Sequence, residues 1–235
     1  MNTFSSFLHN SFDGTNVNYH THFSGKSTDT HWMSDESICA WHGITCADET
    51  ADVGVTEINL EGNSLKLKAN ESDTVSALFF SLPSLKKLDL RGNDKLPLNL
   101  QFVSSQIESL QLSATGLKSL AGIGGATNLK ELHVTDNDLT GEIPDEIFNL
   151  IAMEKLFLSF NKFNGTLSSR IGELTNLKEF YAFTNELTGE LPAELGNLAQ
   201  LEHLVIGKNR ISGELFHGCS SSVHFPMFCS HYNFV

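Results

Sequence analysis

Apolar residues recur along the middle of the chain in one template, L-x-x-L-x-L-x-x-N-x-L, which fits the sequence seven times. The seven copies begin at residues 55, 85, 107, 129, 153, 177 and 201. The L-x-L segment alternates with a period of two, which predicts a short strand whose apolar side chains face a core. The asparagine follows at a turn, where its amide can bond backbone groups that no strand satisfies. The pattern therefore predicts stacked coils with a ladder of buried asparagine amides, one per coil.

The copies differ in regularity. From the fourth copy onward the starting positions are evenly spaced, whereas the interval between the first and second copies is longer and the third copy has Thr115 at the asparagine position. A single coil of this length cannot bury enough apolar surface to offset the entropy of ordering its backbone. Such repeats are therefore expected as an array with capped ends.

A further phrase follows the asparagine in the later copies. It reads Leu139-Thr140-Gly141-Glu142-Ile143-Pro144 in the fourth copy and Leu187-Thr188-Gly189-Glu190-Leu191-Pro192 in the sixth. Over residues 32–215 the chain resembles the plant-type leucine-rich repeat, which is found in receptor-like proteins, receptor-kinase ectodomains and secreted inhibitors. The resemblance implies an α/β solenoid, a right-handed horseshoe with short parallel strands on its concave face and mostly irregular or 3-10 segments on its convex face.

The segment before the first copy resembles the N-terminal cap of the same family. Its residues Cys39-Ala40-Trp41-His42-Gly43-Ile44-Thr45-Cys46 match C-x-W-x-G-[IV]-x-C. The resemblance implies a Cys39–Cys46 disulfide that pins this loop over the apolar end of the first coil. The alternatives are two free thiols or half of a zinc site. The chain then divides into a polar, flexible segment at 1–31, the cap at 32–54, seven repeats at 55–215, and an atypical C-terminal tail or cap at 216–235.

The C-terminal end departs from the family pattern, because Phe216-His217-Gly218-Cys219 stands where the repeat should continue. Cys219 and Cys229 are candidates for a disulfide in a C-terminal cap, and the alternative is a poorly ordered or truncated end. Together with His217 and His231 they can also be read as a zinc set, but their spacing matches no common site. We therefore expect no metal site in this tail.

Catalytic and cofactor chemistry find no support in the sequence. The segment Gly122-Ile123-Gly124-Gly125 lacks the Lys-Ser/Thr that follows in a phosphate-binding loop. No Ser/His/Asp or Cys/His set suits nucleophilic catalysis, and most Asp and Glu residues occupy variable repeat positions. We therefore expect neither an enzyme nor a protein that needs a cofactor.

Composition narrows the partners and the compartment. The chain has 28 acidic against 15 basic residues and a formal net charge of −13, which disfavours nucleic acid because phosphate binding needs dense Lys and Arg. No run is long and apolar enough for a membrane span, and the N-terminus shows no signal peptide. The cap cysteines and the sequons at Asn70 and Asn164 nevertheless agree with an extracellular or cell-surface location. The explanations left open are an incomplete N-terminus, a gene start placed wrongly, or a membrane anchor in missing sequence.

Strand alternation puts the x positions of the template on the concave face, where a partner would bind. The first two copies present charged residues there, whereas the fifth and sixth present aromatic ones. Exposed aromatic clusters are typical of binding hot spots. The alternative is that these bulky rings pack over neighbouring repeats. The candidate ligand-binding residues are His133, Phe157, Phe160, Tyr181, Phe183, His203 and Val205.

These features favour a non-catalytic recognition function. The family resemblance implies receptor-like or inhibitor-like binding of a protein or peptide, or of a glycan, through the concave face in cell-surface signalling or defence. The alternatives are an intracellular scaffold with reduced cysteines and a fragment of a longer membrane receptor.

Overall fold

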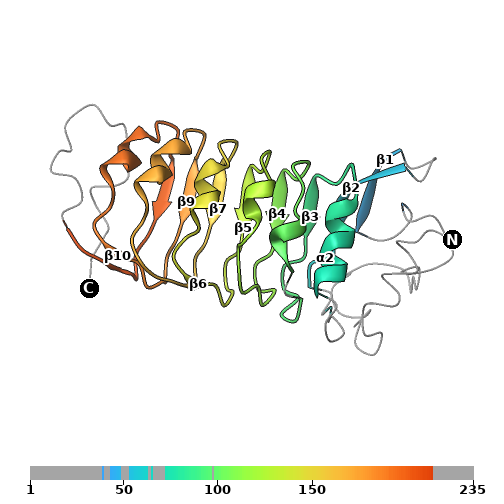
Figure 1. Cartoon of the computed structure of the whole chain (residues 1–235), viewed down its shortest axis with the longest axis horizontal. Helices are drawn as coiled ribbons and strands as arrows, with labels where there is room; N and C mark the ends of the chain where they lie inside the picture. The colour runs from blue at the N-terminus through green and yellow to red at the C-terminus, as the bar shows by residue number, and fades with distance from the viewer. Residues whose placement is uncertain are drawn as a thin grey trace, which may run out of the picture.

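The computed structural model of the chain describes the repeat region and part of the segment before it. Its described residues are 39, 43–48, 53–62, 65, 72–96 and 98–213. Within them the coils stack into an elongated solenoid that begins at β1 and ends with the coil of β11 and β12 (Figure 1). Asn70, Cys219 and Cys229, which the sequence singled out, lie outside the described residues.

One side of the solenoid is a sheet with one strand from each coil. Within the described residues this sheet has eight strands in the order β1-β2-β3-β4-β5-β7-β9-β11. They are β1 Ile44–Asp48, β2 Val53–Asn59, β3 Lys87–Asp89, β4 Ser109–Gln111, β5 Glu131–His133, β7 Lys155–Phe157, β9 Glu179–Tyr181 and β11 His203–Val205. From β2 onward neighbouring strands are parallel, and each template position pairs with the same position of the next coil. The predicted parallel strands of the concave face are thus confirmed.

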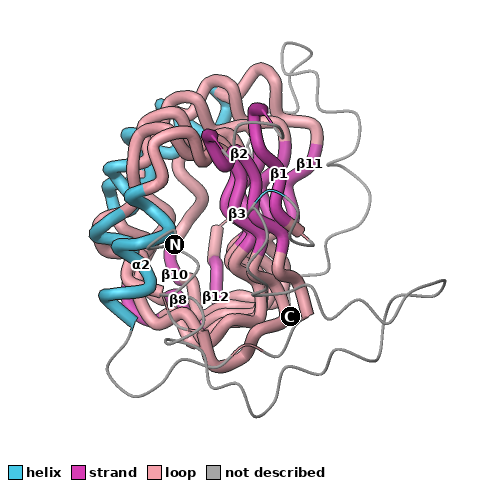
Figure 2. Tube along the Cα trace, turned by 90° about the vertical axis from the view of Figure 1, so that its right-hand side faces the viewer, coloured by secondary structure: helices cyan, strands magenta, loops and turns pink. Residues whose placement is uncertain are grey.

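The opposite side of the coils consists mostly of 3-10 segments, as the family resemblance implies. They are η2 Leu100–Phe102, η3 Ile123–Gly125, η4 Asp145–Asn149, η5 Ser169–Glu173 and η6 Ala193–Asn197. Figure 2 shows the helical segments on the side of the coils away from the eight-stranded sheet. The exception is the α-helix α2, Ser72–Ser81, which the template did not predict. It occupies the long interval after the first copy and buries Val75, Phe79 and Phe80 at helical spacing.

Two short parallel pairs of strands follow the asparagine turns of the later coils. They are β6 Thr140–Gly141 with β8 Lys162–Phe163, and β10 Thr188–Gly189 with β12 Arg210–Ile211. An isolated bridge between Thr166 and Thr188 joins the two pairs. The shared Thr-Gly phrase of the later copies therefore forms a second line of backbone pairing along the flank of the solenoid.

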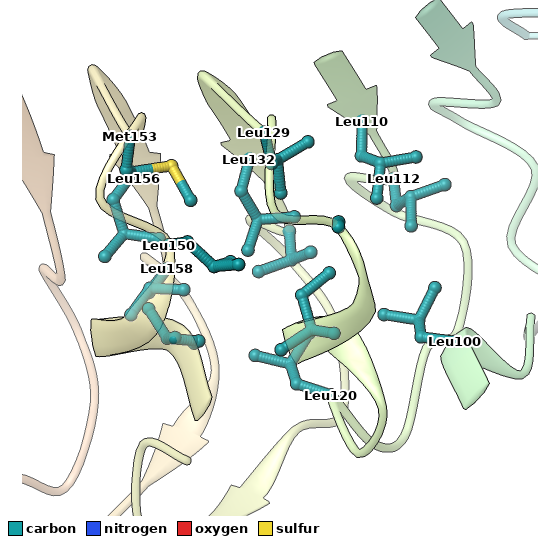
Figure 3. Packing of buried hydrophobic residues seen from close by; sticks show 14 of the residues in the cluster. Leu100, Leu110, Leu112, Leu120, Leu129, Leu132, Leu150, Met153, Leu156 and Leu158 are labelled. Carbon is teal, nitrogen blue, oxygen red and sulfur yellow. The ribbon is translucent and has the colours of Figure 1, made fainter. Parts of the chain in front are cut away.

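The inward apolar positions of successive coils form one continuous core. The central strand residues Leu110, Leu132 and Leu156 are fully buried. Leu120 and Leu150, which flank the 3-10 segments, are buried opposite them in the same layer (Figure 3). Because each coil is covered above and below by its neighbours, the apolar surface that a single coil would expose is removed from water.

The predicted asparagine ladder is present in the described residues. Asn161 Nδ2 donates to the carbonyl oxygens of Val134 (2.9 Å) and Leu158 (3.1 Å), and its Oδ1 accepts from the backbone N–H of Leu139 at 3.2 Å. Bonds to backbone groups of two coils are made in the same way by Asn93, Asn137, Asn185 and Asn209. Each amide therefore joins two coils and satisfies backbone groups that no strand pairs.

The third coil, which has threonine in place of asparagine, is completed by the next coil. The Thr115 hydroxyl donates to the Leu112 carbonyl at 2.8 Å. Asn137 Nδ2 donates to the same carbonyl, also at 2.8 Å, and its Oδ1 accepts from the backbone N–H groups of Thr115 and Leu117. One exception in the template is therefore tolerated because the ladder asparagine of the following coil reaches back.

The N-terminal edge of the sheet is closed by β1, which pairs antiparallel with β2. Cys39 and Cys46 form a disulfide with a Cα–Cα distance of 5.7 Å, which ties β1 to the residues before it. Gly43 has a φ of +82°, and a Cβ at this position would collide with the carbonyl oxygen of Asn59. The glycine of the cap motif is therefore required by the close approach of these two backbones.

Replacing Asn161 with alanine should lower the free energy of unfolding by about 2–3 kcal/mol, because buried backbone groups of two coils would lose their partner. The measurement is urea unfolding followed by circular dichroism. Asn128→Ala, at an exposed turn position, is the matched control and should change the stability by less than about 0.5 kcal/mol. Equal effects of the two substitutions would contradict the structural role of the asparagine ladder.

Candidate functional site

The in-register strands arrange the outward-facing residues of the concave face in columns that run across the coils. One column, which we call the charge column, consists of Glu131, Lys155, Glu179 and His203. A second, which we call the aromatic column, consists of Gln111, His133, Phe157, Tyr181 and Val205. Side chains from coils that are far apart in the sequence therefore lie next to one another.

Three rings of the aromatic column stack and form the aromatic ladder, defined as His133, Phe157 and Tyr181. The ring centroids of His133 and Phe157 are 4.1 Å apart with an interplanar angle of 17°, and those of Phe157 and Tyr181 are 4.7 Å apart with an angle of 9°. Neighbouring strands are separated by about 4.8 Å, so strand register alone brings flat side chains to stacking distance. The stacked faces cover one another, and the half-buried rings present their edges to the concave surface.

The charge column holds alternating charges beside the aromatic ladder. Lys155 Nζ lies 3.8 Å from Glu131 Oε1 and 3.3 Å from Glu179 Oε1. The hydrogen bond to Glu179 and the charge of its carboxylate raise the pKa of Lys155 above its ordinary value. Ion pairs at such exposure stabilise a fold by only about 0–1 kcal/mol. Their main effect is to hold one cation between two carboxylates next to the rings.

Phe160 and Phe183 form a separate contact at the rim of the concave face, called here the aromatic pair. Their ring centroids are 5.6 Å apart with an interplanar angle of 70°, an edge-to-face arrangement. The Phe183 ring lies over Gly207 of the next coil, where a Cβ would contact it at 3.5 Å. Lys208 Nζ is 5.2 Å from the Phe183 ring centroid, within range of a cation–π interaction. Phe160, in contrast, is 50% exposed.

The backbone of Phe160 is left-handed, with a φ of 55°. This conformation costs a residue other than glycine about 1–2 kcal/mol, and the first two coils have Gly62 and Gly92 at the same position. The edge-to-face contact with Phe183 stabilises the fold by only about 0.5–1.5 kcal/mol. The stability of the fold therefore gives little reason for a half-exposed phenylalanine here.

The N-terminal part of the concave face is charged, and its charges pair with one another. Arg91 Nη2 lies 2.6 Å from Asp89 Oδ2 and 3.0 Å from Glu61 Oε2. Lys87 Nζ lies 2.8 Å from Glu57 Oε1. Because these charges are already paired, the aromatic part of the face offers a partner more apolar surface at a lower cost of desolvation.

The structure separates the seven residues predicted from the sequence into groups. His133, Phe157 and Tyr181 form the aromatic ladder, with Val205 next in their column. Phe160 and Phe183 form the aromatic pair. His203 is exposed in the charge column, beside Glu179. The strand register and the ring contacts give these positions. Their role in binding remains a prediction.

Two charged residues next to the rings were missed in the sequence. Lys155 lies one full repeat after Glu131, and Lys208 lies one full repeat after Thr184. The repeat period therefore places each in a row that the sequence had already shown. A search for aromatic side chains alone does not find the lysines that contact or flank them.

The sequon asparagine Asn164 is exposed and follows β8 on the flank, outside the eight-stranded sheet. Among the described residues, no helix has the length and apolar character to cross a membrane. In the same part of the chain, His, Cys, Asp and Glu side chains form no group of three or more that could hold a metal ion.

His133 is the titratable ring of the aromatic ladder. Its burial lowers its pKa below the ordinary value of about 6.5. The charges of Glu131 and Glu179 oppose this effect, and those of Arg91 and Lys155 add to it. The imidazole is therefore held in the neutral form that stacks on Phe157.

The chain is similar in sequence to short parts of plant receptor-like proteins. The Leucine Rich Repeat family profile matches residues 128–150. The chain is 30% identical over 141 residues to Receptor-like protein 49 of Arabidopsis thaliana, an alignment that covers 58% of this chain and 14% of that protein. The chain therefore spans only a small part of this relative.

Two solved ectodomains have a similar fold. One is the LRR ectodomain of the Arabidopsis receptor kinase HAESA in complex with an N-terminally extended IDA peptide hormone ligand, with a TM-score of 0.65, 27% identity, and coverage of 76% of this chain and 30% of that chain. The other is the LRR ectodomain of the membrane receptor kinase GASSHO1/SCHENGEN3 from Arabidopsis thaliana in complex with CASPARIAN STRIP INTEGRITY FACTOR 2. Its TM-score is 0.63 at 27% identity, and the match covers 79% of this chain and 25% of that chain.

The stability of the fold should fall as the pH is lowered from about 7.5 to 5.5, and His133→Phe should reduce this dependence. With a folded-state pKa below the unfolded value of about 6.5, His133 binds more protons when unfolded, so acid favours unfolding. Phenylalanine keeps the stack and removes the titration. Urea unfolding at several pH values measures the difference between the two proteins. Parallel pH profiles would contradict a lowered pKa of His133 in the folded chain.

Proposed function

We propose, from the premise that this chain is a plant-type leucine-rich-repeat protein, that it is a non-catalytic recognition module whose concave face binds an extended segment of a protein or peptide. The observation that carries the proposal is the aromatic ladder of His133, Phe157 and Tyr181, which lies beside fixed charges on the concave sheet. Aromatic residues in such clusters supply much of the binding energy in protein interfaces.

The geometry of the aromatic ladder favours a peptide over a glycan. A sugar ring packs its flat C–H face against the face of an aromatic ring, but both faces of Phe157 are covered by its neighbours. Ring edges carry the positive part of the aromatic quadrupole. They therefore suit the carbonyl oxygens and apolar side chains of an extended chain, while Lys155 and Glu179 can pair with its charged side chains.

The related ectodomains support recognition of this kind. HAESA, at 27% identity, was solved with a peptide hormone ligand. The charges of the concave face also suit binding better than catalysis, because Glu131 and Glu179 are both paired with Lys155. A carboxylate whose oxygen already contacts a lysine ammonium is less available to take a proton from a substrate.

The same premise favours an extracellular or cell-surface location. The Cys39–Cys46 disulfide suits an oxidising compartment. Asn164-Gly165-Thr166 provides an exposed acceptor for N-glycosylation on the flank, where a glycan would leave the aromatic ladder uncovered.

Substituting serine for Phe157 and Tyr181 together should weaken peptide capture by about 30-fold or more, because two central aromatic contacts are lost. The protein is first used to select binders from a displayed library of random peptides. The affinities of the selected peptides for the wild-type and variant chains are then compared by isothermal titration calorimetry. Because both rings are half-buried, the thermal midpoint should fall by only a few degrees.

Ile151→Ser is the matched control, since Ile151 is 62% exposed and directly follows η4 and Leu150, on the side away from the sheet. This substitution should leave peptide affinity unchanged. The proposal is wrong if the wild-type chain selects no peptide, or if Ile151→Ser weakens binding as much as the ladder substitutions do.

Mass spectrometry of the protein isolated from its native cells should find Cys39 joined to Cys46 and a glycan on Asn164. The expected signs are a mass increase of about 2 Da on reduction and a larger mass decrease on treatment with an N-glycosidase. Reduced cysteines and an unmodified Asn164 would favour the intracellular scaffold instead.

A further inference from the structure

A row of left-handed residues runs along the rim of the concave face, one position before the asparagine position of each template copy. We call it the turn row. Its members in the described residues have φ values between 51° and 72° and are Gly62, Gly92, Ala114, Asp136, Phe160, Thr184 and Lys208. The last four members are linked through the asparagines that follow them. The backbone N–H of Asn137 donates to the carbonyl oxygen of Phe160 (3.3 Å), that of Asn161 to Thr184 (3.3 Å) and that of Asn185 to Lys208 (3.2 Å).

The side chains of the turn row are ordered by charge. Asp136 is exposed at one end, the half-exposed Phe160 follows, and Lys208 is exposed at the other end. Neither Asp136 nor Lys208 forms an ion pair within the described part of the chain, whereas the adjacent Lys162 is paired with Asp138 at 2.7 Å. Among the described residues the row therefore offers an acid without an ion pair, an apolar ring, and a cation that lies over the Phe183 ring but has no ion pair, in that order.

The fold itself does not call for these side chains. Glycine occupies the same turn in the first two coils, and the left-handed backbone disfavours a bulky residue such as Phe160. Strained positions of this kind cluster at functional sites such as ligand clamps. An exposed ring held in a strained turn between two unpaired charges has the character of a contact site.

We propose that the turn row from Asp136 to Lys208 is a docking edge for an extended protein segment with the order basic-x-apolar-x-acidic. This proposal rests on the peptide recognition proposed above and names the chemistry of the partner. Three strand spacings of about 4.8 Å separate Asp136 from Lys208, or about 14 Å in all. An extended chain rises about 3.3 Å per residue, so residues i and i+4 span about 13 Å and project from the same face. Residue i+2 then lies about 6.6 Å along the row, between Phe160 at about 4.8 Å and Thr184 at about 9.6 Å, and is nearer to Phe160.

The test uses the 15N-labelled full chain and two synthetic peptides, Ac-Lys-Ser-Leu-Ser-Glu-NH2 and Ac-Lys-Ser-Leu-Ser-Lys-NH2. Titration followed by NMR should show amide shifts at Asp136, Phe160 and Lys208, with at least threefold tighter binding of the first peptide. Lys208→Glu should reverse this preference, because both ends of the row then carry an acid.

Phe160→Gly separates docking from folding. It removes the ring and relieves the left-handed backbone, so it should weaken binding of the first peptide by about tenfold without lowering the thermal midpoint. The proposal is overturned if the two peptides bind equally, if the shifts fall elsewhere, or if Phe160→Gly destabilises the chain. Loss of library-peptide capture in the Phe157 and Tyr181 variant tests the aromatic ladder separately, so failure of either site leaves the other result standing.

Discussion

Each ladder asparagine bonds backbone groups of its own coil and of the coil before it, and this double contact fixes the register in which the strands stack. Asn161, for example, holds carbonyl oxygens at Val134 and Leu158 with one amide group. Without the buried amides, these backbone groups would be left unpaired in an apolar core, which is costly. The leucine core then fills the interior, because register brings equivalent apolar positions of neighbouring coils together.

The same register determines the chemistry of the concave surface. A residue meets its counterpart in the next coil at about 4.8 Å, so flat rings stack and opposite charges pair without any adjustment of the backbone. His133, Phe157 and Tyr181 come from three coils, yet they behave as one surface. The contacts on this surface are therefore determined by the residues that share a template position in successive coils. Residues next to one another in the chain affect them only weakly.

Much of this fold could be predicted from the sequence because the repeated leucine positions form the core and the repeated asparagine positions bond the backbone. The strands, the core and the asparagine ladder follow directly from that period. The helix α2 did not, because it lies in the one long interval where the template gives no information. The flanking pairs of β6 with β8 and β10 with β12 were also not predicted, since the Thr-Gly phrase that marks β6 and β10 does not by itself indicate backbone pairing between coils.

The candidate binding face was predictable in outline and not in detail. Alternation identified the outward positions, but the split of the aromatic residues into a stacked ladder and a separate edge-to-face pair depends on ring orientation and on the space left by Gly207. Lys155 pairs with Glu179, and Lys208 lies over the Phe183 ring. Each partner belongs to a neighbouring coil and is about a whole repeat away in the sequence. Such contacts appear only when the columns are compared across coils.

The constant length of the later coils has a consequence for how such a chain can change over generations. Coils that begin at residues 129, 153 and 177 share one length and contact only their neighbours. Duplication of one such unit would insert a complete strand, its core leucines and its asparagine, and every flanking column would keep its register. The concave surface can therefore be lengthened or reordered by whole coils without a new core.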